Sequence, residues 1–413
     1  MDDRYDEVLE KYDFSVSKMS RARGAMVLWT DKGIKLLCET HASAGRLVWE
    51  NKVKNHLKEN GFERIDTFVI NMDQTISTLS RNGVRYLVKD WFNGRECDLC
   101  NLSEVRLAAS NLARLHISLQ KARFEAGENI GSERAGASAG KGADASAGKG
   151  ADASAGKGAG ASAGKGADAS TGKGADASAG KGAGASASAG TDASAGKGAG
   201  TSAGKGTDEG GSERADASAV EGTAATKEDT LAIFVKHNRE LNHIRNYLKG
   251  KKFRNEFESR LLSAYPALYG QANESVEGIK NISLGEVNII HGSYTYHNVI
   301  MCEDGIATTS FDKCTYGYKL MDLYYFLRKT MEKNDWKEPY GMAVLEGYDE
   351  VYTLENYEKQ ALACLLAYPE KFWKLASHYM NGKKTWLSVK NMEKLELILA
   401  QMEARQDFIA KIC

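Results

Sequence analysis

The apolar and polar positions divide this chain into an early part that predicts strands and a later part that predicts helices. Short apolar runs bounded by turn residues favour antiparallel strands. Such runs occupy 14–19, 24–29, 34–39, 68–72 and 85–90. Between the third and fourth runs, residues 47–60 place Leu47, Val53 and Leu57 near one face, as a helix does, and Gly61 follows its end. The pattern predicts a small sheet that carries one helix.

Helical periodicity dominates after residue 102. From Ser103 onward, apolar residues recur at three- and four-residue spacing, which predicts a long helix. Further helices are expected at 228–249, 252–265, 320–334, 342–363, 369–380 and 389–410. A short extended unit interrupts them, with strands at 287–290, 299–302 and 306–311. A small sheet with one helix, followed by a larger helical part with one hairpin, indicates an α+β, two-lobed protein-kinase-like fold.

The domain organisation follows from a change in composition. We expect an N-terminal β-rich lobe at 1–94 and a helical C-terminal lobe formed by 95–130 and 223–413. The intervening residues 131–222 hold 25 of the 42 glycines, no proline, and only Val220 as an apolar residue besides alanine. In this segment lysine recurs every eight residues, in a unit close to A-D-A-S-A-G-K-G, with one register position skipped.

The repeat segment cannot offset its ordering entropy, because it has no apolar face to bury. Its frequent glycines also prevent a helix from propagating. We therefore predict a disordered, low-complexity insert with an end-to-end distance of about 50–60 Å. Two interpretations stay open: an expanded repeat in a tolerant loop, or a surface-displayed tether.

Charge and hydropathy exclude some classes of protein. The 55 basic and 55 acidic side chains leave no net charge, which argues against binding nucleic acid mainly through its phosphates. No run of 18 apolar residues is present, so no membrane span is expected. The first residues, MDDRYDEVLEKYDF, lack the apolar stretch of a secretory signal.

The seven cysteines are an odd number, which is typical of reduced thiols in a cytosolic protein. Cys97 and Cys100 form a C-x-x-C pair. A structural zinc site needs a second pair at matching spacing, and the sequence has none. We favour free thiols over a zinc or redox site.

A polar loop between two expected strands carries the candidate chemistry: His291-Gly-Ser293-Tyr-Thr-Tyr-His-Asn298. In a protein kinase the corresponding loop runs His-Arg-Asp, with four residues before an Asn. The Asp accepts the nucleophile's proton and the Asn holds Mg²⁺. His291 and Asn298 fit this spacing, but Ser293 occupies the position of the base. A serine cannot act as a general base at pH 7, and losing the base typically costs about 10²–10⁴-fold in rate.

The loop resembles that of the aminoglycoside and choline phosphotransferases, which have His-Gly-Asp at this place. In those families an Asp that binds metal ends the next strand, with a Gly seven residues on and an Asp-Leu twelve on. Gly317 and Asp322 fit if the metal position is Ser310. The resemblance thus implies structural roles for Gly317 and Asp322 and a missing carboxylate at Ser310, with Asp312 two positions away as a substitute.

The same resemblance extends to the nucleotide site. The lysine that pairs with nucleotide phosphates in the family corresponds to Cys38 rather than Lys35, and Glu50 would be its partner. Trp91 lies where the lobes should join, and would either line an adenine slot or pack at the hinge. ATP and Mg²⁺ are the implied cofactors if the site is active, with Asn298 and Asp312 as candidate metal ligands.

Five phrases in this order resemble the CotS family of spore coat proteins, whose fold is aminoglycoside-phosphotransferase-like. They are Thr30-Asp-Lys-Gly-Ile-Lys-Leu-Leu37, Lys89-Asp-Trp-Phe-Asn-Gly-Arg-Glu-Cys-Asp98, Phe311-Asp-Lys-Cys314, Asp322-Leu-Tyr-Tyr-Phe-Leu-Arg-Lys329 and Tyr368-Pro-Glu-Lys-Phe-Trp-Lys374. The resemblance covers nearly the whole chain outside 131–222. It implies synthesis in the mother-cell cytoplasm of a spore-former, deposition on the spore coat, and other coat proteins as partners.

Each candidate residue also has an ordinary structural interpretation. His291 would cap its loop, Asn298 would stabilise the same loop, and Asp312 would be a solvated carboxylate. The absent carboxylates favour a non-catalytic scaffold component of the coat. The alternative is a small-molecule phosphotransferase with Asp312 in a rearranged site. A third hypothesis is a module that binds a nucleotide or metabolite without turning it over.

Deleting residues 131–222 should change the melting temperature very little, because the segment brings no apolar face to the folded part. Differential scanning calorimetry of the full and shortened chains measures this. A fall of many degrees in the shortened chain would contradict the prediction.

Overall fold

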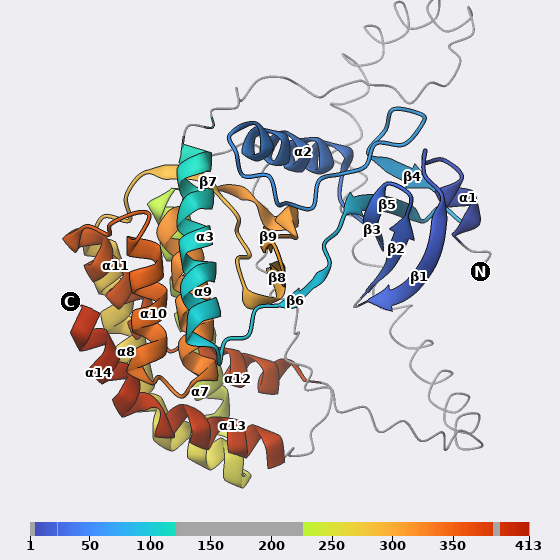
Figure 1. Cartoon of the computed structure of the whole chain (residues 1–413). Helices are drawn as coiled ribbons and strands as arrows, with labels where there is room; N and C mark the ends of the chain where they lie inside the picture. Colours follow the sequence, from blue (N-terminus) through green and yellow to red (C-terminus); the bar gives the residue numbers. More distant parts are fainter. Residues whose placement is uncertain (1–4, 23, 121, 123–225, 383–388, 413) are drawn as a thin grey trace, which may run out of the picture. The chain divides into compact units, whose positions relative to one another are not determined.

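The computed structural model describes residues 5–22, 24–120, 122, 226–382 and 389–412 (Figure 1). They belong to a single structural unit. The insert predicted at 131–222 lies outside the described residues. Within the described ranges, no helix combines the length and the apolar character needed to cross a bilayer.

The first part of the chain forms an antiparallel sheet of five strands in the order β1-β2-β3-β5-β4. The strands are β1 Val16–Ala22, β2 Ala25–Thr30, β3 Gly33–Glu39, β4 Ser77–Leu79 and β5 Arg85–Asp90. The short helix α1, Asp6–Leu9, and Tyr12 pack on one side through a cluster that includes Leu28 and Leu37. The helix α2, Ala44–Glu59, begins at Ser43, whose hydroxyl accepts the Arg46 N–H at 3.1 Å.

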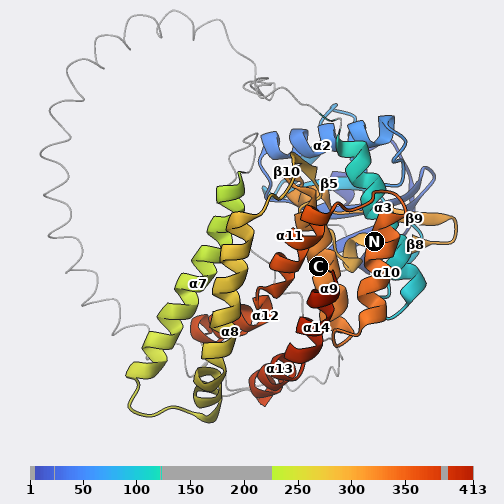
Figure 2. The ribbon, with the colours of Figure 1, turned by 90° about the vertical axis from the view of Figure 1, so that its left-hand side faces the viewer.

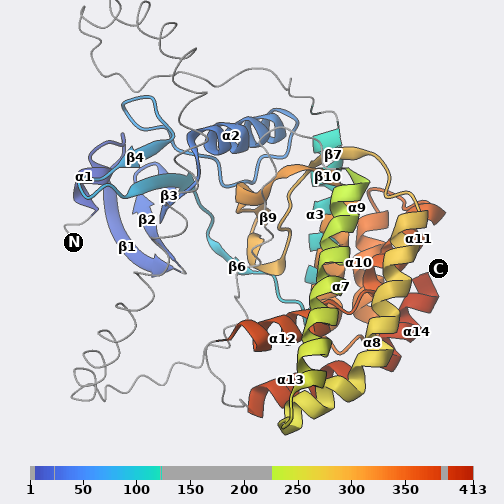
Figure 3. The ribbon, with the colours of Figure 1, turned by 180° about the vertical axis from the view of Figure 1, so that it is seen from behind.

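The rest of the chain is mainly helical and carries two small sheets. In chain order the elements are β6 Gly94–Glu96, α3 Leu102–Gln120, α7 Lys227–Gly250, α8 Glu256–Asn281, β7 Val287–Ile290, η1 Tyr296–Asn298, β8 Val299–Cys302, β9 Gly305–Thr308, η2 Phe311–Lys313, β10 Thr315–Tyr318, α9 Lys319–Lys333, α10 Glu338–Asp349, α11 Asn356–Ala367, α12 Glu370–Asn381, α13 Val389–Ala400 and α14 Met402–Ile412. Strand β7 pairs with β10, and β8 lies between β6 and β9. Figures 2 and 3 show α7 and α8 side by side.

Three expected helices have different bounds in the structure, and one of them, expected at 389–410, is divided at Gln401 into α13 and α14. The helix expected at 252–265 continues to Asn281, through Pro266. A proline normally ends a helix because it lacks the N–H. Here the buried side chains of Leu261 and Leu268, on either side of Pro266, keep the helix packed on the core. The helix expected at 342–363 is divided into α10 and α11, and the second begins at a capping box between Glu355 and Glu358.

The strand expected at 68–72 is also wrong. Only an isolated bridge between Phe68 and Lys89 forms there. The Asn71 side chain accepts the Thr75 N–H at 2.8 Å and donates to Thr78. An asparagine side chain that forms hydrogen bonds with nearby residues in this way competes with the backbone pairing of a strand. The sequence pattern also missed β4 and β6, which have only three residues each, and β10, whose pairing with β7 becomes visible only in the fold.

Helices α3 and α10 approach each other closely where α10 has a glycine. A Cβ on Gly347 would lie 2.2 Å from the carbonyl oxygen of Arg106, on α3. The Arg106 guanidinium then bridges Glu346 and Glu350 beside this contact. Gly347 therefore sets the spacing of the two helices, one of which leads the chain into the insert.

Gly347→Ala should lower the free energy of unfolding by about 1–3 kcal/mol, because the added methyl group forces the helices apart. The matched control is Gly270→Ala, within α8, where a Cβ meets nothing within 4 Å. There alanine should stabilise by up to about 1 kcal/mol. Urea unfolding followed by circular dichroism measures both, and equal effects would contradict the close approach.

Candidate functional site

One buried aspartate, Asp322, holds the loop that follows β7 through hydrogen bonds. Asp322, on α9 and 0% exposed, accepts the backbone N–H of His291 at 2.7 Å and that of Gly292 at 2.9 Å. His291 is itself fully buried, and its Nε2 lies 3.0 Å from the Thr309 carbonyl oxygen. Burial lowers the pKa of His291 despite the nearby Asp322 carboxylate. The imidazole is therefore neutral at pH 7 and joins the loop to the end of β9.

The loop also packs against the turn that follows β9. Gly292 has φ +74°, and a Cβ there would lie 2.2 Å from the Lys313 carbonyl oxygen. Any residue other than glycine would be strained at this φ, and its Cβ would displace the backbone at Lys313. A similar close approach occurs at Gly317, where a Cβ would meet Ile290 Cδ1 at 2.6 Å.

Ser293 and Asn298 are bonded to each other within the loop. The Asn298 side-chain amide donates to the Ser293 carbonyl oxygen at 2.8 Å, and the Ser293 N–H donates to His291 Nδ1 at 3.2 Å. The Asn298 backbone carbonyl accepts the Thr309 N–H at 2.9 Å. These bonds hold the loop in shape, and they give the Asn298 amide nitrogen a local acceptor.

Ser310, the predicted metal position, has the left-handed conformation, with φ +67° and ψ +58°. Its N–H donates to Asp66 Oδ2 at 3.0 Å. Asp312 is exposed, and its backbone carbonyl accepts hydrogen bonds from Arg46 on α2. Among the residues that the structure describes, no three His, Cys, Asp or Glu side chains gather closely enough to hold a metal ion.

A cluster of four buried charges lies between α2 and β5, and we call it the charge cluster: Glu50, Lys54, Asp66 and Lys89. Their exposed fractions are 2%, 0%, 1% and 7%. Lys54 Nζ lies 2.6 Å from Glu50 Oε1 and donates to the Asp66 carbonyl oxygen at 2.8 Å. Lys89 Nζ lies 3.3 Å from both Glu50 Oε1 and Asp66 Oδ2. Lys89 thus contacts two carboxylates, and the two positive and two negative charges of the cluster balance.

Lys54 makes one further ion pair within the charge cluster, and an aromatic ring covers both lysines. Lys54 Nζ lies 3.2 Å from Asp66 Oδ1, close enough for an ion pair, but Oδ1 accepts no hydrogen bond from the described residues. The Phe68 ring covers both ammonium groups, with its centroid 4.1 Å from Lys54 Nζ and 5.1 Å from Lys89 Nζ. The ring is part of what excludes water from the four charges.

The pKa values follow from this arrangement. Burial alone would raise the pKa of Asp66, but Lys54, Lys89 and the Ser310 N–H outweigh it and lower the pKa. Burial alone would lower the pKa of Lys89, but Asp66 and Glu50 outweigh it and raise the pKa. Both groups are therefore charged across the neutral range.

Cys38 faces the charge cluster from β3. The charges of Lys89, Asp66, Lys54 and Glu50 all act on its thiol, whose pKa is raised chiefly by burial. Lys35 lies elsewhere, since its Nζ pairs with Asp90 Oδ1 at 2.6 Å. The structure thus brings Cys38 and Glu50 to one place and leaves Lys35 outside it.

Sequence reasoning missed Lys54, Asp66 and Lys89. Two signals were present. Glu50 and Lys54 are one helical turn apart among the apolar positions of α2, where charged residues are unusual. Lys89 ends a run of buried residues in β5. A lysine buried in a strand requires a carboxylate partner, which periodicity alone cannot identify.

Helix α2 also holds the turn after β9. Arg46 donates to the carbonyl oxygens of Phe311 and Asp312, and Trp49 Nε1 donates to that of Cys314 at 3.3 Å. The Thr308 N–H donates to the Arg64 carbonyl oxygen at 2.9 Å. Together with the Asp66–Ser310 bond, these contacts fix the turn against the first part of the chain.

The other candidates lie apart from the charge cluster. The backbone N–H of Trp91 donates to the Ile34 carbonyl oxygen at 3.0 Å, and the Trp91 side chain is partly exposed. His297 Nδ1 lies 2.6 Å from Glu96 Oε2. Burial raises the pKa of the Cys97 thiol to about 12, so it is protonated at pH 7, while Cys100 is exposed.

Comparison with known proteins gives the fold and one relative. No family model matches the chain. A segment of 100 residues, 24% of the chain, is 31% identical to spore coat protein S of Bacillus subtilis (strain 168). The match spans 28% of that protein, well under two thirds of its length. The resemblance to the CotS family that the sequence predicted is confirmed over these 100 residues.

Solved structures resemble nearly the whole chain. An aminoglycoside phosphotransferase from Alicyclobacillus acidocaldarius matches with a TM-score of 0.66 and 15% identity, over 98% of this chain and 93% of that one. A spectinomycin phosphotransferase, in complex with ADP and spectinomycin, matches with a TM-score of 0.51 and 10% identity, over 97% of each chain. The predicted protein-kinase-like, aminoglycoside phosphotransferase-like fold is confirmed.

Asp66→Asn should lower the free energy of unfolding by about 3–5 kcal/mol at pH 7, because it leaves a buried lysine charge uncompensated. The folded pKa of Asp66 is lowered, so its contribution is complete above the unfolded value near about 3.9 and is lost as the pH falls through the folded pKa. The difference between the wild type and Asp66→Asn should therefore shrink on acidification below about pH 4. Urea unfolding at a series of pH values measures it.

Two controls accompany this measurement. Asp407→Asn changes an exposed aspartate on α14 and should have almost no effect. Adding Lys89→Met to Asp66→Asn removes one charge of each sign and should recover part of the stability. A loss that is independent of pH, or equal for Asp66 and Asp407, would contradict the role of the charge cluster.

Proposed function

We propose that this chain is a non-catalytic, kinase-fold component of a spore coat that acts as a scaffold among other coat proteins. The likeness to spore coat protein S supports the location, and the fold likeness supports the kinase-like framework. On this proposal the chain is made in the mother-cell cytoplasm and then deposited on the coat.

The single observation that carries the proposal is the charge cluster. In an active kinase a lysine meets one glutamate and also reaches the nucleotide phosphates. Here Lys54 and Lys89 each meet two carboxylates and are almost fully buried. Releasing either ammonium to a phosphate would leave a carboxylate buried without a partner, which is costly. The lysines thus stabilise the fold and are not available to a nucleotide.

The two serines add to this argument. Ser293 supplies no base and Ser310 supplies no anionic metal ligand. The backbone N–H of Ser310 already donates a hydrogen bond to Asp66 Oδ2. Mg²⁺ is a hard cation that favours carboxylate oxygens, and the neutral Asn298 amide alone would be a weak ligand for it. The base position and the metal position of a phosphotransferase site thus lack a carboxylate here, and the Asn298 amide nitrogen bonds within its own loop.

One observation favours the alternative, a small-molecule phosphotransferase. The Asp312 carboxylate is exposed, and its charge helps to raise the pKa of Lys89. It therefore lies within electrostatic reach of the charge cluster, at a position from which a substitute metal ligand could act. On this alternative, ATP with Mg²⁺ binds through Asp312 and Asn298.

A thermal-shift titration with ATP and Mg²⁺ separates the two. The scaffold proposal predicts no rise in the melting temperature at about 5 mM nucleotide, because a ligand stabilises only the state that it binds. The alternative predicts a rise that Asp312→Asn abolishes and that Asp407→Asn preserves. A saturable rise that depends on Mg²⁺, together with phosphoryl transfer that Asn298→Ala removes, would overturn the scaffold proposal.

A further inference from the structure

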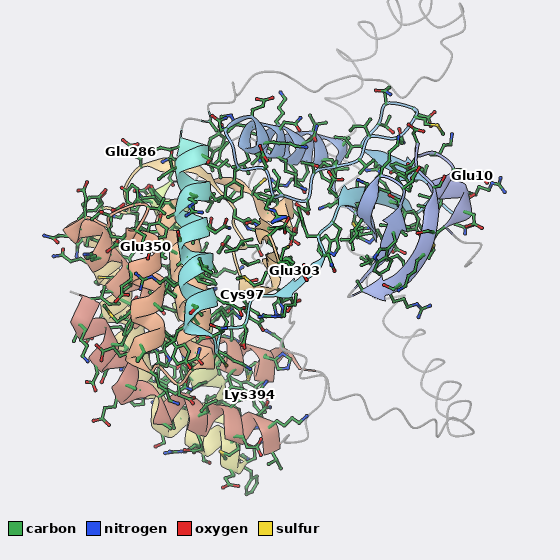
Figure 4. The ribbon with its side chains drawn as sticks, in the orientation of Figure 1. Glu10, Cys97, Glu286, Glu303, Glu350 and Lys394 are labelled. Atoms are coloured by element: carbon green, nitrogen blue, oxygen red, sulfur yellow. The ribbon has the colours of Figure 1, made fainter. Side chains whose placement is uncertain are left out.

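The connection between α7 and α8 combines positive charge with exposed aromatic side chains. Residues 241–255, which run from the last turns of α7 to the start of α8, contain five lysines and arginines and one histidine, but no aspartate or glutamate. Figure 2 shows this connection at the end of the α7–α8 hairpin, away from the five-stranded sheet. Figure 4 labels Lys394 on α13, a helix that joins α8 near this end through the ion pair of Glu396 with Arg260. We call residues 247–254 the basic tip.

Polar bonds hold the chain in place through the basic tip. Arg254 Nε and Nη2 donate, each at 2.6 Å, to the carbonyl oxygens of Leu248 and Lys249 in the last turn of α7. The guanidinium therefore satisfies carbonyl groups that the end of a helix leaves open. Asn255 then begins α8 through a capping box with Glu258. The path of the turn is fixed by these bonds.

Two aromatic side chains of the basic tip face solvent. Phe253 is 88% exposed and Tyr247 is 51% exposed. Neither ring takes part in the hydrogen bonds that fix the turn. Apolar surface is favoured away from water, so a phenylalanine gains nothing from this position within the described chain. Exposed aromatic side chains on an ordered turn are typical of a surface that contacts a partner.

The lysines of the basic tip leave positive charge available to that partner. Lys251 Nζ pairs with Glu258 Oε1 at 2.7 Å. Lys249 and Lys252 are exposed, and neither forms an ion pair with a carboxylate of the described residues. The tip stays positive even when Glu256, the exposed glutamate in the first turn of α8, is counted against it. Its partner should therefore be anionic.

The combination of exposed rings and available lysines fits an anionic lipid surface. Aromatic rings enter the boundary between headgroups and acyl chains, while lysine side chains extend from it to the lipid phosphates. A lipid surface needs no complementary shape, whereas a peptide needs a groove or a sheet edge, which a turn between two helices does not offer. Nucleic acid needs a positive surface that follows its backbone, and here the positive surface is confined to one turn.

We propose that the basic tip binds the surface of an anionic lipid bilayer, with the ring of Phe253 among the headgroups and Lys249 and Lys252 at the level of the phosphates. Tyr247 would lie beside them, where its hydroxyl group stays hydrated. Such binding needs no spanning helix, and the described residues include none. The inference does not depend on the scaffold proposal, because the tip is not part of the charge cluster or of the loop that carries Ser293.

Sedimentation of the full chain with lipid vesicles tests the proposal. Vesicles of phosphatidylcholine with about 30% phosphatidylglycerol should bind the chain, with half-saturation on the order of 1 mM accessible lipid. Vesicles of phosphatidylcholine alone should bind it far more weakly. Raising the NaCl concentration from about 0.1 M to about 0.5 M should also weaken the binding several-fold, because salt screens exposed charges.

Substitutions in the basic tip separate its two components. Phe253→Ala should weaken binding to the anionic vesicles about fivefold, whereas Phe253→Trp should retain it, since tryptophan favours the membrane interface. Lys252→Gln should weaken it about fivefold, the effect of one charge near an anionic surface. The matched controls are Leu79→Ala, an exposed apolar residue of β4, and Lys58→Gln, an exposed lysine of α2, and both should bind as the wild type does. All these side chains are exposed, so the variants should fold normally.

Three outcomes with vesicles would overturn the proposal. They are the absence of binding up to about 5 mM anionic lipid, equal binding to the two kinds of vesicle, and equal weakening by the tip variants and their controls. Polyglutamate and duplex DNA supply two further arms. Binding of either polymer that Lys252→Gln weakens, without binding of the vesicles, would assign the tip to an acidic polypeptide or to nucleic acid and would equally overturn the proposal.

Discussion

Four charges in a space without water impose the strictest constraint on this molecule. Glu50, Lys54, Asp66 and Lys89 come from a helix, a loop and a strand, and none of them is tolerable there without the others. Their mutual neutralisation fixes α2 against β5. Through Asp66 it also fixes the turn at Ser310, and Arg46 and Trp49 hold the next residues of that turn. The position of the kinase-like loop relative to the sheet therefore follows from electrostatics as much as from apolar packing.

Much of the fold could be predicted from periodicity, because most of its elements present an apolar face with a regular spacing. The strands that contain Leu28 and Leu37, and the helix that contains Leu112, are of this kind. The failures have local causes. Tertiary packing continues α8 through Pro266 beyond the expected end at residue 265, and Asn71 replaces strand pairing with its own side-chain bonds. The three-residue strands have too few positions to show any period.

Only part of the site could be predicted from the sequence. The loop could be found because its spacing, from His291 to Asn298, is a local property of the chain. The charge cluster joins residues up to 39 positions apart, and its partners become visible only once the fold is known. Spacing identifies a motif, but it does not identify which charges share a cavity.

The backbone bond of Ser310 links the turn after β9 to the charge balance of the molecule. Its backbone N–H donates to Asp66 Oδ2, so a carboxylate introduced at position 310 would add a negative charge close to a cluster whose charges already cancel, and like charges repel. A charged side chain at position 310 would therefore need a compensating change among Asp66, Lys54 and Lys89. The conformation of the turn after β9 and the balance of charge between α2 and β5 are in this way one property of the molecule.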